Sequence, residues 1–204
     1  MAGRRGLAVS LAIVIASMVL LFTVPPPYFV VATFFSTSCM IGAAYALGAL
    51  RGRRPLPKPV LVGLASAALL YGIFYAGAWL VSTYHPFGIT SASEASIYSL
   101  ISSPSNPIYL QVLVLLFDAA GFEAFFRGAL QKRLSARFGL LAAPAVALLD
   151  AAIHIVTLNP LWVGATFVTD LVWGLTYGYG KGTQSSFTSH FVWDVAIFIL
   201  RPIR

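Results

Sequence analysis

The chain is a succession of apolar runs, each near 20 residues long, separated by short polar or basic segments. A helix of about 20 apolar residues spans the hydrocarbon core of a bilayer, and helices satisfy their own backbone groups there. The pattern therefore predicts an all-α, polytopic transmembrane helical bundle. About seven spans are expected, near residues 7–24, 28–50, 60–84, 108–128, 140–158, 161–179 and 185–200.

Residues 85–107 interrupt this pattern. They are rich in Ser, Pro and Gly, with one acid, Glu94, and no Lys or Arg. We expect a surface loop with a short interfacial or re-entrant helix, in which His85 is a solvated loop histidine. No repeat, linker or second domain is visible, so residues 1–204 are expected to form a single transmembrane domain.

Segments with and without basic residues alternate between the predicted spans. The segments at 51–59, 131–138 and 180–183 carry four, three and one Lys or Arg, whereas those at 24–27, 85–107 and 158–161 carry none. By the positive-inside rule, the N-terminus and the basic loops face the cytoplasm. We therefore expect an integral protein of the cytoplasmic membrane. Seven spans would leave Arg201 and Arg204 outside, which weakens the count.

Composition narrows the class of protein. Of the 204 residues, 59% are hydrophobic and only 9% are charged, against about 25% charged in soluble domains. The net charge of +7 does not indicate nucleic acid, because the basic residues lie in the loops between spans. The single cysteine, Cys39, cannot form an internal disulfide and is expected to be a packing residue.

Ionisable residues inside the spans are the candidate chemistry. Each charge at mid-membrane costs about 2.5–3.5 kcal/mol, so such residues face the bundle interior, pair with one another and mark function. Asp118 and Asp170 are expected to be satisfied polar residues that line a cavity. Five of the six acids and two of the three histidines fall in predicted spans, namely Asp118, Glu123, Asp150, Asp170, Asp194, His154 and His190.

Residues 108–158 are interpreted as two helices joined by a basic turn. Glu123 and Arg127 are four residues apart, as are Asp150 and His154, so each pair lies about 40° apart on one helix face. Folding the two helices back antiparallel places Glu123 opposite His154 and Arg127 opposite Asp150. We therefore expect a buried Arg127–Asp150 ion pair that fixes the two helices.

These residue types permit hydrolysis of an amide. A carboxylate beside a neutral histidine can hold and deprotonate a water molecule, and a second histidine with an acid can stabilise the oxyanion. Glu123 with His154 would do the first, and His190 with Asp194 the second. The same four residues are ligand types that zinc accepts, but no helix offers an H-E-x-x-H pair. We therefore expect no cofactor, and a bound zinc ion is the alternative.

Three segments resemble the motifs of a known family. GFEAFFRGAL at 121–130, DAAIH at 150–154 and HFVWD at 190–194 are similar to E-E-x-x-x-R, F-x-x-x-H and H-x-x-x-N/D. Those are the motifs of the CPBP intramembrane proteases, a family of CAAX prenyl proteases and bacteriocin-processing enzymes also called Abi. Their order, membrane context and approximate spacing match over roughly 105–200.

The resemblance implies roles for these residues. Glu123 and Arg127 take the second glutamate and the arginine of the first motif, His154 the histidine of the second, and His190 and Asp194 the third. In the family, the glutamate pair and first histidine are thought to activate water, while the third motif stabilises the oxyanion.

Two departures bear on activity. Phe122 replaces the first glutamate of the pair, which is usually regarded as catalytic, and Asp150 replaces the phenylalanine of the second motif. One hypothesis is a swap, in which Asp150 restores the missing carboxylate or Glu123 takes over as the base. A second is that the site no longer cleaves.

The leading interpretation is an intramembrane endopeptidase. Its cavity is expected to open to the cytoplasmic side, and a peptide or membrane-protein substrate would enter from there or through lipid. The alternatives are a catalytically inactive relative that acts as a membrane scaffold or binding protein, and a proton-coupled transporter that uses the same acids as a relay.

Overall fold

A computed structural model describes residues 4–50, 57–84, 89, 91–101 and 106–203. Within these ranges all regular elements are helical, so the predicted all-α fold is confirmed. The α-helices are α1 (Arg4–Thr23), α2 (Phe29–Ala46), α3 (Pro57–Tyr84), α4 (Ser91–Ile101), α5 (Ile108–Phe122), α6 (Lys132–Phe138), α7 (Ala142–His154), α8 (Pro160–Gly180) and α9 (Thr183–Val195). Two π-helical segments, Glu123–Gln131 and Ala196–Leu200, follow α5 and α9.

The helices are long and apolar enough for a membrane protein. Four stretches of the described residues qualify as membrane spans, and the last, Ile108–Thr157, is a pair of helices that reverses direction at Gly139. Large apolar side chains such as Val31 and Leu61 face outward, at 69% and 65% exposed, while charged groups lie inside. This inverted distribution is what a lipid environment favours.

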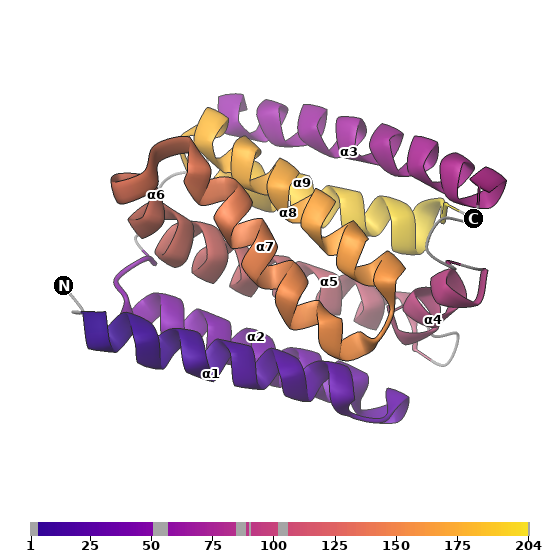
Figure 1. Cartoon of the computed structure of the whole chain (residues 1–204), viewed down its shortest axis with the longest axis horizontal. Coiled ribbons are helices and arrows are strands. Elements are labelled where there is room, and N and C mark those ends of the chain that lie inside the picture. Colours follow the sequence, from indigo (N-terminus) through magenta and orange to yellow (C-terminus); the bar gives the residue numbers. More distant parts are fainter. Residues whose placement is uncertain (1–3, 51–56, 85–88, 90, 102–105, 204) are drawn as a thin grey trace.

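The helices associate in pairs around a central one. α1 packs along α2, α3 along α9, and α7 along α8, while α5 runs between α2 and α9. Figure 1 shows the α1–α2 pair on one side of the molecule and α3 on the other. The central helix carries the first motif, so its π-helical continuation lies at the middle of the bundle.

The helix pair predicted for residues 108–158 exists, but its two arms do not pack face to face. α7 lies mainly along α8, whereas α5 lies mainly along α2 and α9. Two local features explain the difference. The π-helical turns of Glu123–Gln131 rotate the following side chains relative to an α-helix, and Gly139, with φ of 57°, redirects the chain.

Two glycines allow close contacts between helices that are distant in the sequence. A Cβ atom on Gly63 of α3 would lie 2.5 Å from the Ser185 carbonyl oxygen of α9, and one on Gly121 of α5 would lie 2.5 Å from Thr37 Cγ2 of α2. Both helix pairs therefore depend on a missing side chain.

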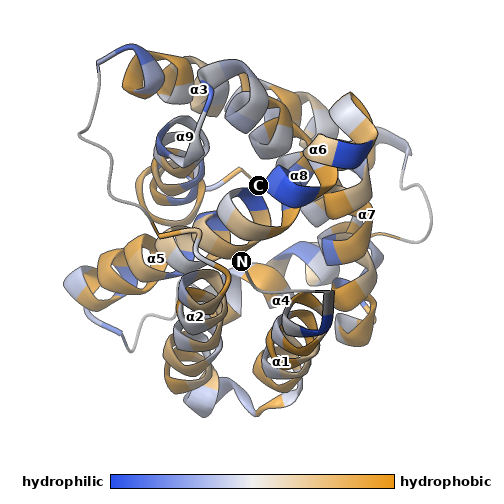
Figure 2. Cartoon of the chain, turned by 90° about the vertical axis from the view of Figure 1, so that its left-hand side faces the viewer, coloured by the Kyte–Doolittle hydropathy of each residue, from blue (hydrophilic) through white to orange (hydrophobic). Residues whose placement is uncertain are grey.

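One end of the bundle is basic. Figure 1 shows the starts of α1 and α3, together with α6 and the α8–α9 turn, at this end, and α4 with the C-terminus at the other. The basic end carries Arg5, Lys58, Lys132, Arg133, Arg137 and Lys181. Figure 2 looks onto it and shows polar residues at α6 and beside α8. The short helix expected within 85–107 is α4, while His85 lies outside the described residues.

Candidate active site

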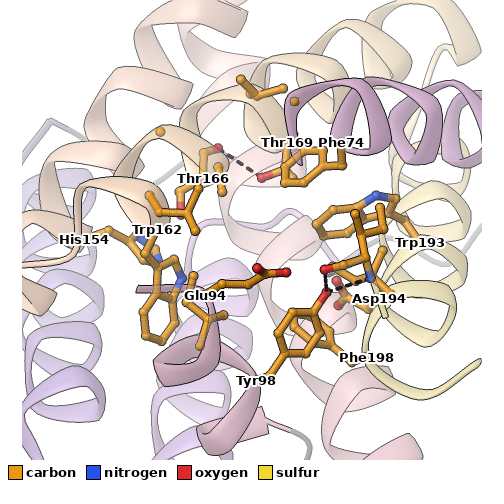
Figure 3. Close-up of a pocket in the computed structure, with 18 of the residues that line it drawn as sticks. Phe74, Glu94, Tyr98, His154, Trp162, Thr166, Thr169, Trp193, Asp194 and Phe198 are labelled. Carbon is orange, nitrogen blue, oxygen red and sulfur yellow. Dashed lines mark hydrogen bonds between the residues drawn. The ribbon is translucent and has the colours of Figure 1, made fainter. Parts of the chain in front are cut away.

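A large cavity occupies the half of the bundle away from the basic end. Its volume is about 1280 Å³, and its wall includes the C-terminal halves of α3 and α9, the N-terminal half of α8, and α4. Most of the lining is aromatic or aliphatic. Figure 3 shows His154 and Asp194 on opposite sides of this space, with Glu94 of α4 between them. The described lining residues with ionisable side chains are Tyr75, Glu94, Tyr98, Asp118, Asp150, His154, His190 and Asp194.

His190 is held on all sides by protein groups. Its Nδ1 lies 3.1 Å from Glu123 Oε1, and its Nε2 lies 3.3 Å from Asp194 Oδ2. The indole of Trp173 stacks on the imidazole with ring centroids 3.6 Å apart, and the Phe122 ring meets its edge at 5.3 Å. The imidazole therefore has a fixed orientation between two carboxylates and beside the cavity.

Arg127 lies at the centre of the bundle and is fully buried. Its Nη2 donates to Asp170 Oδ1 at 2.5 Å and to the Asp170 carbonyl oxygen at 3.1 Å. Its Nε lies 3.8 Å from Glu123 Oε2. Arg127 thus links the Glu123–His190 pair to α8 through a buried ion pair.

His154 occupies a separate part of the cavity wall. Its Nδ1 lies 2.9 Å from the Asp150 carbonyl oxygen and 3.6 Å from Asp150 Oδ1. A carbonyl oxygen only accepts, so Nδ1 carries the hydrogen and a neutral imidazole keeps its lone pair on Nε2. The ring packs between Phe22 and Trp162, with centroids 4.4 and 5.9 Å away.

The structure corrects two of the expected pairings. Glu123 bonds to His190 rather than facing His154. In the described part of the chain, Arg127 forms its ion pairs with Asp170 and Glu123 instead of with Asp150. Both errors have the same cause, because the expected register assumed α-helical geometry through the π-helical turns and a direct contact between α5 and α7.

Other expected contacts are present. His190 and Asp194 contact each other, as do Asp150 and His154, and these four residues line one cavity. Glu123, 1% exposed, lies directly behind His190. Residues from three separate segments of the sequence therefore meet around one space.

Sequence reasoning missed Asp170 and Trp173 as partners. Asp170 was expected to be a cavity-lining acid, but it is the main partner of Arg127. A signal for it existed, since the only arginine within a span must find an internal acid. Trp173 is 17 residues from His190 in the sequence, and this separation gives no local periodicity that would reveal the stack.

The four candidate zinc ligands do not form one ligand set. Both nitrogens of His190 face carboxylates of the protein, and His154 is bonded to Asp150 in another part of the cavity wall. Among the described residues, no group of three or more His, Cys, Asp or Glu side chains has an arrangement that could hold a metal ion.

A protein-family model matches the part of the chain that carries this site. Residues 104–196 match the family model described as "Type II CAAX prenyl endopeptidase Rce1-like". Residues 104–196, here called the CPBP segment, therefore resemble the CPBP family. Comparison with curated proteins and with solved structures gave no match. The CPBP segment covers α5 to α9, so every residue around His190 described above falls inside it.

The CPBP segment also shows how the departure at Phe122 is accommodated. The Phe122 ring stacks on Phe126 at 4.3 Å and lies 5.7 Å from the Arg127 guanidinium carbon. An aromatic ring therefore fills the position of the first motif glutamate and still lines the cavity.

Proposed function

We propose that this chain is an intramembrane endopeptidase that hydrolyses a peptide bond with an activated water molecule. The observation that supports it is the arrangement of His154 and Asp150, His190 and Asp194 around one cavity within a CPBP segment. An apolar bundle that encloses water beside two histidines and several carboxylates has the groups that amide hydrolysis requires.

His154 is the proposed partner of the attacking water. Its Nδ1–H is used by the Asp150 carbonyl oxygen, so Nε2 is left to accept a hydrogen bond from the water molecule. The Asp150 carboxyl, 3.6 Å from Nδ1, would help to hold the imidazole in this orientation. The hypothesis that Asp150 supports His154 required this proximity.

His190 is the proposed electrostatic stabiliser of the oxyanion. Glu123 and Asp194 bracket its ring, and Trp173 fixes the ring plane. A protonated His190 would place positive charge beside the carbonyl oxygen as water adds to the carbonyl carbon. Arg127 is a positioning residue here, because it orients Glu123 and is anchored by Asp170.

The substrate proposed is a peptide or the end of a membrane protein. The cavity wall is mostly apolar and aromatic, with no Lys or Arg among the described lining residues. If the basic end faces the cytoplasm, the cavity lies in the outer half of the membrane. In that orientation the cavity would not open to the cytoplasm. We propose access from the end that carries α4, or through lipid.

Cleavage of a quenched peptide library by the full chain in nanodiscs tests this function. We expect His154→Ala and Glu123→Ala to lose at least about 100-fold in kcat/KM, because the first removes the partner of the attacking water and the second a carboxylate that holds His190. Cys39→Ala, a small apolar change on α2 outside the cavity wall, should retain activity. Equal cleavage by His154→Ala and wild type would contradict the proposed role.

An inactive relative is the second candidate, and Phe122 favours it. The ring occupies the place of the motif glutamate, and the substitution Phe122→Glu would restore a carboxylate there. A wild type without cleavage and a Phe122→Glu variant with cleavage would identify a CPBP scaffold that has lost its chemistry. Cleavage by the wild type would exclude this candidate.

A further inference from the structure

Resting on the proposed function, we propose that Asp118 is the catalytic carboxylate that replaces the glutamate lost at position 122. Asp118 is on α5, one helical turn before Phe122, and both residues line the cavity. Positions four apart share a helix face. A carboxylate has therefore been retained on the same face of the same helix, one turn away from its position in the family motif.

Access to water separates Asp118 from the other membrane-embedded acids. Glu123, Asp150, Asp170 and Asp194 are 1%, 1%, 0% and 5% exposed. Asp118 is partly exposed although it lies deep among the helices, and it lines the cavity. Asp150 and Asp194 also line the cavity, but of these five acids Asp118 is the only one more than 5% exposed. A base that deprotonates water must touch that water, so Asp118 meets this condition best.

Existing contacts also separate these acids. Glu123 is bound to His190 and Arg127, Asp170 to Arg127, and Asp194 to His190. Asp118 accepts a hydrogen bond from Thr37 Oγ1 at 3.2 Å, at its Oδ1 atom. That bond holds the carboxylate in place while leaving Oδ2 for a water molecule.

Asp118 shares the cavity wall with both histidines. His154 of α7 and His190 of α9 line the same space. α5 also packs on α2, from which Thr37 is the polar contact of Asp118. A water molecule on Asp118 would therefore lie in the cavity that both imidazoles border.

The step is balanced without a further reactant. The Asp118 carboxylate takes one proton from water as the water oxygen bonds to the substrate carbonyl carbon, giving a tetrahedral oxyanion near His190. The carbon–nitrogen bond then breaks, and the Asp118 carboxyl returns its proton to the leaving nitrogen. The products are a carboxylic acid and an amine, and Asp118 ends as it began.

Peptide cleavage by Asp118→Asn in nanodiscs tests the assignment. We expect kcat to fall by at least about 100-fold with KM changed less than about threefold, because the neutral amide keeps the volume and the Thr37 contact but cannot accept the proton. The double variant Asp118→Asn with Phe122→Glu should recover at least about tenfold, because it restores a carboxylate one turn further along the same face.

Ser36→Ala on α2 is the matched control, since Ser36 is buried, bonds to Ser17 and is not in the cavity wall. It should cleave like the wild type. If the wild type cleaves and Asp118→Asn cleaves equally well, the assignment is wrong while the proposed function stands. A wild type that cleaves none of the peptides overturns both.

Discussion

Arg127 is the residue whose environment most constrains the rest of the site. It is fully buried in an apolar bundle, where an isolated guanidinium would be very costly. Asp170 and Glu123 supply the compensating charge from two different elements. The motif arginine therefore has a structural reason to persist, because without its ion pairs two acids would be left buried without a countercharge.

Removing the Asp170 carboxylate should destabilise the protein strongly. Asp170→Ala leaves the Arg127 charge buried with only Glu123 at 3.8 Å, so we expect a loss of about 3–5 kcal/mol in the free energy of unfolding. Unfolding in mixed micelles with increasing SDS measures it. The control is Thr169→Ala, the preceding residue on α8, whose hydroxyl bonds within its own helix and should cost about 1 kcal/mol. Equal losses would contradict the ion-pair account.

Trp173 sets the plane of the His190 ring. The rings are nearly parallel, at 12°, with centroids 3.6 Å apart. Such contacts contribute about 0.5–1.5 kcal/mol beyond burial. Because the stack comes from α8 while the two carboxylates come from the first motif and α9, three elements must be in place before the imidazole is oriented.

At the scale of helices, the pairing of α3 with α9 positions His190 and Asp194. This pairing brings backbones close at Gly63, where a Cβ atom would lie 2.5 Å from a carbonyl oxygen of α9. Overpacking a tight helix contact costs about 1–3 kcal/mol. The size of the side chain at position 63 of α3 therefore affects where α9 can lie.

Gly63→Ala should lower the free energy of unfolding by about 1–3 kcal/mol. Gly72→Ala on the same helix is a matched control, because nothing lies within 4 Å of its Cβ position and replacing a helical glycine gains about 0.5–1 kcal/mol. The same SDS titration compares the two. A Gly63→Ala variant as stable as Gly72→Ala would show that α3 and α9 are further apart than described.

Asn159 connects α4 to the start of α8. The Asn159 side-chain oxygen caps α8 by accepting from Leu161 N and Trp162 N, while its Nδ2 donates to the Ser93 carbonyl oxygen and to Ser96 Oγ. One side chain therefore starts α8 and holds a helix that covers the cavity.

Asn159→Asp separates these two functions, because aspartate caps a helix equally well but has no donor for α4. We expect the amide hydrogens of α4 to exchange about tenfold faster or more, since two hydrogen bonds worth about 1 kcal/mol each are lost. Exchange in α8 should stay unchanged. Asn159→Ala should accelerate exchange in both helices. Unchanged α4 exchange in Asn159→Asp would show that other contacts hold α4.

For the whole molecule, the helical bundle and the burial of its ionisable residues were predictable, as were contacts within one helix, whereas contacts between helices were not. Hydrophobic run lengths gave the helices, because span length is fixed by the bilayer. Ionisable residues inside those runs pointed inward, because lipid excludes charge. These two rules act residue by residue and need no knowledge of which helices are neighbours.

The pairings failed where the structure depends on helix neighbours and helix type. The sequence of Glu123–Gln131 gives no sign of its π-helical turns, which change where Arg127 points. Whether α7 lies along α5 or α8 depends on packing over the whole bundle, so Asp150 and Asp170 could not be distinguished as partners of Arg127.

The side of the membrane that the cavity faces can be decided by labelling. In a variant with Cys39→Ala, single cysteines would be introduced as Ser99→Cys on α4, at the cavity end, and Ala136→Cys on α6, at the basic end; both positions are exposed. Because basic loops stay in the cytoplasm, a membrane-impermeant maleimide added to intact cells should label Ser99→Cys and leave Ala136→Cys unlabelled until the cells are opened. The reverse pattern would place the cavity on the cytoplasmic side and the basic end outside, so that substrates would come from within the cell.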